Sequence, residues 1–181
     1  GYGGSCFPKD TQALVKTAEQ VNVPNLVVRA AIRANEDQKV LMVEKIKLLT
    51  GDLRGKTIAL LGLSFKPNTD DIRDATSLVI IDHVLRAGAK IKAYDPVAQE
   101  AMQKVYPSIQ YCRDAYEAAS GADCLVVVTE WNEFRELDLA KLKSLLRSAK
   151  LMDCRNVYDP AEMRKLGFDY AGVGRGHILK V

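Results

Sequence analysis

Several features that mark particular classes of protein are absent from this sequence or rare in it. The 181 residues include two histidines and four cysteines, and the cysteines form no CxxC pair, which leaves a bound metal such as zinc without support. The longest apolar runs, such as LVVVT at 125–129, are far shorter than the roughly 20 residues of a membrane-spanning helix. No signal peptide is recognisable. We therefore expect a cytoplasmic protein with reduced thiols and no membrane contact.

An excess of charge of one sign is also missing. The formal net charge is +3 and no basic stripe is present, which argues against nucleic acid as a partner but is compatible with a small anionic ligand. Hydrophobic residues make up 48% and charged residues 27% of the chain. This composition is typical of a globular protein with one good core and an appendage.

The first part of the chain has the pattern of a helical segment. Residues 8–20 are expected to form one helix, and a second helix is expected from Pro24 to Gly51, with apolar residues at three- and four-residue steps and a polar gap at 35–39. Such a length favours a connecting or dimerising helix. A long core helix of a single domain is the alternative.

From Lys56 onward, short apolar strands alternate with helices. Strands are expected at 57–63, 91–95, 109–112, 124–129, 150–154 and 168–174, with helices at 75–87, 97–105, 114–120, 137–149 and 161–167. This alternation predicts an α/β fold: a long helical segment at 1–52, followed at 53–181 by a Rossmann-like, doubly wound parallel sheet of about six strands. Ligands of such sheets bind beyond the carboxyl ends of the strands.

The glycine fingerprint of dinucleotide-binding sheets is missing. The turn after the first strand, LGLSFKPN, has a single glycine, so the close approach to a pyrophosphate that GxGxxG allows is not available there. The GVGRG run at 172–176 is followed by only a few residues, so we interpret it as a terminal turn. The chain thus has no ordinary site for the adenosine half of NAD.

The opening motif, GYGGSCFPKD, places a cysteine just before a predicted helix. The N–H groups of a first helical turn carry partial positive charge and favour a thiolate, so Cys6 is a candidate nucleophile. Asp10 falls in that first turn, where its carboxylate could hold or deprotonate a water near the sulfur. The alternative is structural: a glycine-rich turn, a cysteine that packs as a small apolar residue, and an aspartate that only stabilises the helix.

A charged loop, FKPNTDDIRDATS, follows the first predicted strand at the expected ligand edge. Lys66 and Arg73 could contact phosphates, Arg73 through its planar fork and Lys66 as a point charge. The alternative is a solvated cluster whose charges pair with one another.

Five motifs, in this order and spacing, resemble the UDP-glucose/GDP-mannose dehydrogenase family, and within it the UDP-glucose 6-dehydrogenases. They are GYGGSCFPKD, LGLSFKPNTDDIRDATS, YDP at 94–96, VVVTEWNEF at 126–134 and DCRNVYD at 153–159. The resemblance implies an NAD-binding domain, a long central helix that dimerises, and a domain that binds the nucleotide sugar. This chain is similar to the last two parts only, and it begins inside the cysteine motif, which predicts a fragment.

The resemblance also implies a role for individual residues. Cys6 matches the nucleophile of a four-electron oxidation that uses two NAD and passes through a thiohemiacetal and a thioester, and Asp10 matches the aspartate that assists the hydrolytic water. Cys6, Lys9 and Arg73 match positions near the cofactor. Positions that contact the nucleotide sugar are matched by Gly1, Tyr2, Gly3, Phe65, Lys66 and Arg155. The sequence departs at Cys154, where many relatives have glycine.

The resemblance also implies partners, and several alternatives to it stay open. We expect a UDP sugar as ligand, a homodimer through the helix at 24–50, and no NAD reduction by the chain alone, because the other catalytic residues of the family precede its first residue. One alternative is a nucleotide-binding and dimerisation module without redox activity. Others are a related GDP-mannose or UDP-N-acetylmannosamine dehydrogenase, or a thiol hydrolase that uses His83 or His177.

Overall fold

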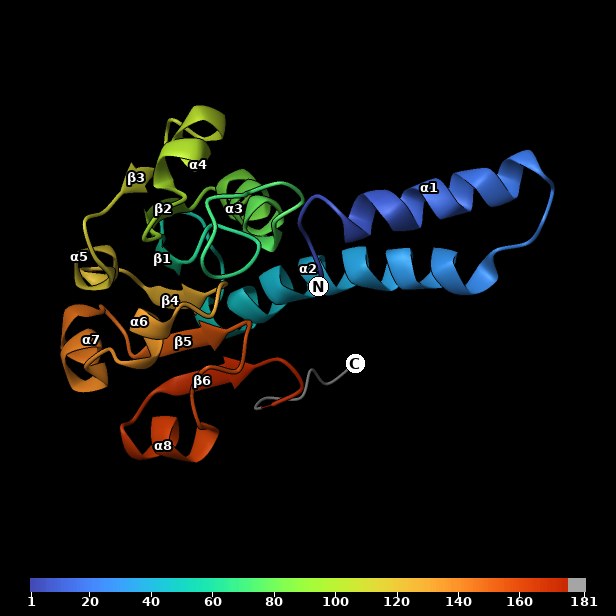
Figure 1. The fold of residues 1–181 in the computed structure, drawn as a ribbon. Helices are drawn as coiled ribbons and strands as arrows, with labels where there is room; N and C mark the ends of the chain where they lie inside the picture. Colours follow the sequence, from blue (N-terminus) through green and yellow to red (C-terminus); the bar gives the residue numbers. More distant parts are fainter. Residues whose placement is uncertain (176–181) are drawn as a thin grey trace.

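The computed structural model describes residues 1–175 as an α/β body with a projecting helical arm (Figure 1). The arm is a hairpin of α1 (Phe7–Gln20) and α2 (Leu26–Thr50). Asn22 takes a left-handed conformation, with φ of 54°, in the turn between the two helices, a conformation that asparagine tolerates better than most residues. Both helices were predicted from the sequence, and no helix among the described residues is long and apolar enough to cross a membrane.

The body is built on one parallel sheet. Its strands are β1 (Thr57–Leu61), β2 (Lys90–Tyr94), β3 (Gln110–Tyr111), β4 (Cys124–Val127), β5 (Lys150–Asp153) and β6 (Asp169–Gly172). They pair in the order β3-β2-β1-β4-β5-β6, and every pairing is parallel. The predicted fold class, a Rossmann-like parallel sheet of about six strands, is therefore confirmed.

Helices cover both faces of this sheet (Figure 1). The helices after β1 are α3 (Thr76–Arg86), α4 (Gln99–Val105), α5 (Ala115–Ala119), α6 (Asn132–Arg135), α7 (Leu139–Leu145) and α8 (Pro160–Lys165). Side chains of α2, α3 and α4 pack on one face, and those of α5, α6, α7 and α8 on the other. The sheet is doubly wound, as the alternation of strands and helices predicts.

Capping residues explain where several of these helices begin and end. Side chains of Asp114, Asp138 and Asp159 each accept a hydrogen bond from a backbone N–H of the first turn of α5, α7 and α8 respectively. Gly88, with φ of 82°, follows the end of α3, in the left-handed conformation that glycine adopts easily.

Two helix predictions differ from the structure. The helix expected at 137–149 is shorter, because Leu146 has extended backbone, with ψ of 145°, and the N–H of Arg147 bonds to the carbonyl of Ala122. The short helix α6 was not predicted, since its four residues are too few to show a helical period.

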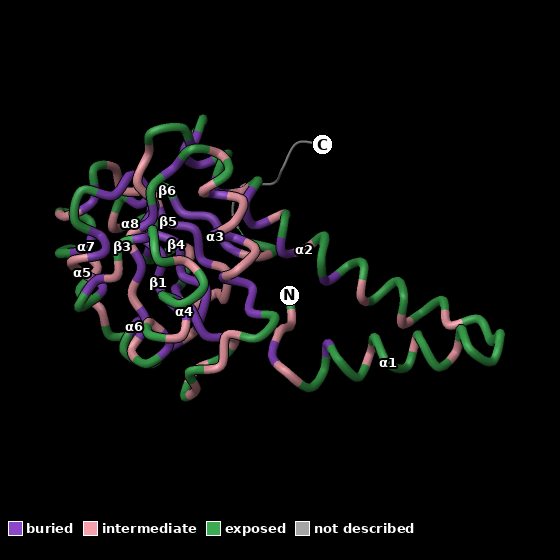
Figure 2. Tube along the Cα trace, turned by 90° about the horizontal axis from the view of Figure 1, so that it is seen from above, coloured by how far each residue is buried: buried purple, intermediate pink, exposed green. Residues whose placement is uncertain are grey.

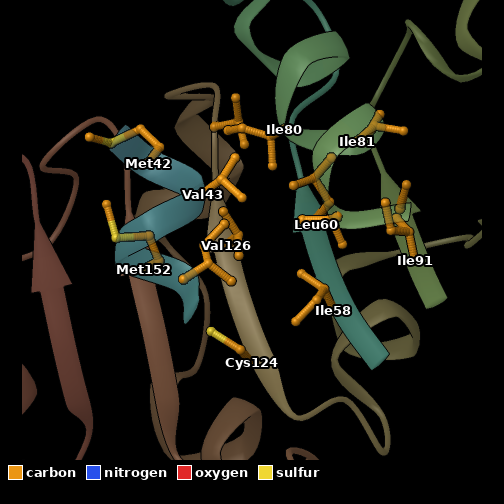
Figure 3. Close-up of a cluster of buried hydrophobic side chains, with 14 of the residues drawn as sticks. Met42, Val43, Ile58, Leu60, Ile80, Ile81, Ile91, Cys124, Val126 and Met152 are labelled. Atoms are coloured by element: carbon orange, nitrogen blue, oxygen red, sulfur yellow. The ribbon is translucent and has the colours of Figure 1, made fainter. Parts of the chain in front are cut away.

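The core follows from the alternation of side chains along the strands. Ile58 and Leu60 of β1 point to the face that α2 and α3 cover, whereas Ala59 and Leu61 point to the opposite face. Figure 3 shows the first of these layers, in which Val43 of α2 lies among side chains of α3 and the central strands. Because both faces are covered, the central strands β1 and β4 are apolar at every position after Thr57.

The long helix α2 is a core helix over its second half only. Its first half stands with α1 outside the body and is largely exposed, whereas its second half is buried against the sheet (Figure 2). Met42, Val43 and Ile46 belong to the same core as the strands. The division into a segment at 1–52 and a domain at 53–181 stays a prediction, and α2 links the two parts through this packing.

The burial of α2 predicts a difference between two neighbouring aliphatic residues. Ile46 is fully buried, whereas Leu48 is 61% exposed on the same helix. Ile46→Ala should lower the free energy of unfolding by about 2–5 kcal/mol, and Leu48→Ala should change it by less than about 0.5 kcal/mol. Urea unfolding followed by circular dichroism measures both values. Equal effects of the two substitutions would contradict the packing described for α2.

Candidate active site at the carboxyl edge of the sheet

The carboxyl ends of β1, β2 and β4 are tied together by one buried carboxylate, that of Asp95. Asp95 accepts hydrogen bonds from the backbone N–H groups of Leu63 at 2.7 Å and Ala98 at 2.8 Å, and from the indole of Trp131 at 3.1 Å. The hydroxyl of Ser64 lies 3.3 Å from the same carboxylate. These bonds compensate for the loss of solvation of a fully buried carboxylate. The turns that follow three strands are therefore held in fixed positions.

A second buried carboxylate, that of Asp153, organises the turn after β5. It accepts hydrogen bonds from the backbone N–H groups of Arg155 and Tyr158 at 2.9 and 3.0 Å, and from the hydroxyl of Tyr170 at 3.0 Å. Burial and the charge of Asp153 raise the pKa of Tyr170, so this hydroxyl stays a donor. The turn thus fixes the backbone from which Arg155 extends.

The turn after β1 lies very close to the residues that follow β4. Gly62 has φ of 92°, and a Cβ at this position would lie 2.5 Å from the Cβ of Thr129. The hydroxyl of Thr129 donates a hydrogen bond of 2.6 Å to the carbonyl of Ser64. A glycine is required here for the approach of β1 to β4, whereas the residues that follow it, Leu63 and Ser64, are not the glycines of a dinucleotide turn.

Arg155 links the turns after β1, β4 and β5. Its guanidinium donates hydrogen bonds to the carbonyl of Phe65 at 3.1 Å and to that of Val128 at 2.9 Å. It also forms an ion pair of 3.0 Å with Glu130. Phe65 and Arg155, both predicted to bind substrate, are thus brought together. Lys66 is exposed, with its ammonium 5.3 Å from the centre of the Phe65 ring.

A cavity of about 240 Å³ opens between α2 and the ends of β4 and β5. Its lining includes Gly1, Gln38, Met42, Cys154, Arg155 and Asn156. Gly1 and Arg155, two of the predicted substrate residues, therefore face the same space.

The glycines of the opening loop allow it to lie directly on the charged loop after β1. A Cβ on Gly3 would lie 2.3 Å from the carbonyl oxygen of Asp74, and one on Gly4 would lie 2.7 Å from the Phe65 ring. The N–H of Gly4 donates a hydrogen bond of 2.9 Å to the carbonyl of Arg73. Only residues without a side chain fit between these partners, which explains the glycine run in physical terms.

Tyr2 is held by a residue that was not predicted to belong to the site, Asn35 of α2. The backbone N–H of Tyr2 donates to Asn35 Oδ1 at 2.6 Å, and Asn35 Nδ2 donates to the carbonyl of Tyr2 at 3.2 Å. The signal for this contact in the sequence is the polar gap at 35–39 within the apolar pattern of the long helix. The pattern shows the gap but not the segment that packs against it.

Cys6 lies immediately before α1, as predicted, and is exposed. Its carbonyl accepts a hydrogen bond of 2.9 Å from the N–H of Asp10. The Asp10 carboxylate forms an exposed ion pair of 2.8 Å with Lys9. The hydrogen bond with Asp10 raises the pKa of Lys9, and the nearby Cys6 acts in the same direction.

Arg73 also lies near Cys6, but it is paired within its own loop. Its Nε and Nη2 atoms contact the two carboxylate oxygens of Asp71 at 2.9 and 2.7 Å. These hydrogen bonds raise the pKa of Arg73, with a smaller effect of Cys6 in the same direction. Cys6, Lys9 and Arg73, predicted to lie near the cofactor, are thus close to one another.

The remaining cysteines and His83 do not join this cluster. Burial raises the pKa of Cys112, and it raises those of Cys124 and Cys154 to about 12. His83 lies in α3, where its Nδ1 is 2.9 Å from the carbonyl of Val79. His177 lies outside the described residues.

Comparison with known proteins matches two stretches of this chain to one family. Residues 59–160 match the UDP binding domain of the UDP-glucose/GDP-mannose dehydrogenase family, and residues 1–37 match the central domain of the same family. The chain is 48% identical to the UDP-glucose 6-dehydrogenase of Rhizobium meliloti and 46% identical to that of Pseudomonas aeruginosa, each over 97% of this chain and 40% of the relative. The chain thus spans about two fifths of the length of these relatives.

A solved structure supports the same assignment. The UDP-glucose dehydrogenase of the archaeon Pyrobaculum islandicum is 31% identical and superposes with a TM-score of 0.84, over 95% of this chain and 38% of that one. Because the superposition covers 95% of this chain, it includes the arm as well as the sheet. With its sheet and the cysteine-bearing segment both matched, the chain belongs to the UDP-glucose/GDP-mannose dehydrogenase family.

Proposed function

We propose that this chain supplies the sulfur nucleophile and the nucleotide-sugar edge of an NAD-dependent UDP-glucose 6-dehydrogenase, which oxidises UDP-glucose to UDP-glucuronate. The supporting observation is the contact between the two predicted motifs: Gly4 lies on the Phe65 ring and donates to the carbonyl of Arg73. This contact keeps Cys6, two residues further on, next to the loop that carries Lys66. A nucleophile placed at the ligand edge is what a covalent oxidation of a bound sugar needs.

The groups at this edge suit the parts of a UDP sugar. The exposed ammonium of Lys66 is available for the diphosphate. Arg155 is already paired with Glu130, so it offers oriented N–H donors to neutral oxygens rather than an unpaired charge. The backbone of Gly1, Tyr2 and Gly3 passes alongside and can contact the sugar closely.

The residues present fit only one end of NAD. The turn after β1 lacks the glycines that a pyrophosphate needs, whereas Lys9 and Arg73 are cations close to Cys6. When bound, NAD accepts the two hydrides of the reaction. Lys9 and Arg73 would face its reactive end, and the chain alone is expected to reduce no NAD in an absorbance assay.

Cys6 carries the covalent chemistry in this proposal. Once the sugar C6 alcohol has lost a hydride and a proton, the Cys6 thiolate adds to the carbonyl carbon of the aldehyde, and the oxygen takes up a proton to give a thiohemiacetal. Loss of the second hydride and of the hydroxyl proton leaves a thioester. Water then attacks the carbonyl carbon, the C–S bond breaks, and the carboxylate and the thiolate are released with two protons. Asp10, in the first turn of α1, holds that water.

The arm offers a surface for a second copy of the chain, and we propose a homodimer through the helix at 24–50. Leu26 and Val27 are 74% and 82% exposed, which is unusual for neighbouring apolar residues on a helix unless they meet a partner. The four free thiols are compatible with the reducing cytoplasm, where we place the enzyme.

The first test compares the reactivity of the four cysteines. Iodoacetamide at pH 8 should modify Cys6 first, because it is exposed, whereas Cys124 and Cys154 have pKa values of about 12. Raising the pH to 10 still leaves only about 1% of such thiols ionised, so the preference should persist. Mass spectrometry of the peptides measures each rate. Equally slow modification of all four would favour the module without redox activity.

The second test measures the binding of UDP-glucose by calorimetry. Lys66→Ala should weaken binding by about tenfold, since a hydrogen bond to a charged group is worth about 1.5–3 kcal/mol. The control is Lys141→Ala, which removes another exposed lysine that lies over an aromatic ring, that of Tyr116, at 3.9 Å. The control should bind like the unchanged chain. An absence of heat for the unchanged chain, or an equal loss in both variants, would count against the site.

The third test concerns the dimer. Val27→Arg should raise the dimer dissociation constant by at least about tenfold, because a charge would be buried in the apolar contact. Val105→Arg makes the same change at an exposed valine of the body, 52% exposed at the end of α4, and should leave the dimer intact. Sedimentation equilibrium distinguishes the two. A monomeric unchanged chain would refute the proposed interface.

A further inference from the structure

We propose that Asn35 is the positioning residue for the nucleophile: it holds the loop that places Cys6 at the nucleotide edge. This inference rests on the proposed role of Cys6. Asn35 is only 7% exposed on α2, at the point where the arm enters the body. Its side-chain amide pairs with Tyr2 as a neighbouring strand would, by accepting from the N–H and donating to the carbonyl of the same residue.

The network around Asn35 fixes the orientation of its amide. Nδ2 also lies 3.3 Å from Glu36 Oε1, and the ammonium of Lys39 donates to that same oxygen at 2.9 Å. The amide oxygen must therefore face the N–H of Tyr2, because a flipped amide would oppose a donor to a donor and an acceptor to an acceptor. The side chain of Lys39 is only 5% exposed, whereas that of Glu36 is 56% exposed, so the network is shielded from water on the side of Asn35 and Lys39.

Asparagine needs such a reason to occupy this position. It is a poorer helix former than the alanine and leucine residues around it, and a buried polar side chain is costly unless it is hydrogen-bonded. At Asn35 both amide groups are satisfied, and the main-chain groups that they satisfy belong to the opening loop. The side chain therefore stabilises the position of that loop rather than the helix that carries it.

The loop needs an external restraint because its own residues supply little. Gly3 and Gly4 separate Tyr2 from Ser5 and Cys6, and glycine has the greatest backbone freedom of any residue. Gly4 is held by the carbonyl of Arg73, and the Tyr2 ring contacts the Phe7 ring edge-on at 4.6 Å. Asn35 provides the fixed point at the other end of the glycines. Without it, Tyr2 keeps its ring contact with Phe7 at the start of α1 but loses its tie to α2.

In this arrangement, Asn35 determines where the Cys6 sulfur lies but not how reactive the sulfur is. Cys6 is exposed next to α1, and the start of that helix does not depend on Asn35. Loss of Asn35 should therefore leave the reaction with a small freely diffusing reagent unchanged. A reaction with an electrophile held at the nucleotide edge should slow, because such a reaction depends on a near-attack geometry that a misplacement of about 1 Å can disturb.

The experiment compares two alkylating probes on Asn35→Leu. One probe is iodoacetamide, and the other is a UDP ester with a bromoacetamido group on a short arm, from which the sulfur displaces bromide as the C–S bond forms. At saturating UDP probe, the rate constant for modification of the Cys6 peptide should fall by about tenfold. The iodoacetamide rate should stay within about twofold. Asp37→Leu, which adds the same side chain at an exposed position of α2, should change neither rate.

Each outcome decides between the inference and the proposed function. If the unchanged chain reacts with the UDP probe no faster than with iodoacetamide, Cys6 does not face a nucleotide site and the proposed function fails. If the UDP probe is fast on the unchanged chain and equally fast on Asn35→Leu, only the positioning role fails. A parallel fall in both rates also overturns that role. Should Asn35→Leu not fold by circular dichroism, Asn35→Ala, with its good helix former, gives the same comparison.

Discussion

The buried carboxylate of Asp95 is the constraint on which the ligand edge depends. A parallel sheet brings the carboxyl ends of its strands to one side, but the turns that follow are free to diverge unless something joins them. Asp95 joins them by accepting from backbone groups after β1 and β2 and from the Trp131 indole after β4. Asp153 does the same for the turn after β5. Both carboxylates are fully buried, so their hydrogen bonds meet little competition from water.

The helix α2 extends this constraint to the arm. Its second half is packed in the sheet's core through Val43 and Ile46, and about two to three turns before these residues Asn35 holds the opening loop. The loop in turn lies on the Phe65 ring and the Arg73 carbonyl. The cysteine motif is therefore held by contacts to both the arm and the body, although it is far from the sheet residues in sequence. The helix thus connects the cysteine loop to the carboxyl edge of the sheet, which is what the roles proposed for these two parts require.

The cations at the carboxyl edge of the sheet differ in whether they are paired with a carboxylate. Arg155 and Arg73 are each paired with a carboxylate, Glu130 and Asp71 respectively, which fixes their guanidinium planes. Lys66 remains an exposed cation over an aromatic ring. A rigid paired donor suits the recognition of neutral oxygens, and a mobile cation suits a diphosphate whose charges are spread over several atoms. The edge thus has two kinds of cationic group, as the proposed binding of a nucleotide sugar requires.

The sequence by itself determined the fold class, the helical arm and the place of Cys6 before a helix, because apolar periodicity, strand alternation and the residues at helix ends are local properties. It also identified Phe65, Lys66 and Arg155 as residues that follow strands at one edge. Only the tertiary structure decided which of these groups touch: the pairing of Arg155 with the carbonyl of Phe65, and the clamp of Asn35 on Tyr2, 33 residues away along the chain. Periodicity indicates which face of a helix or strand is buried, but not which distant segment lies against it, since that depends on how all the elements pack together.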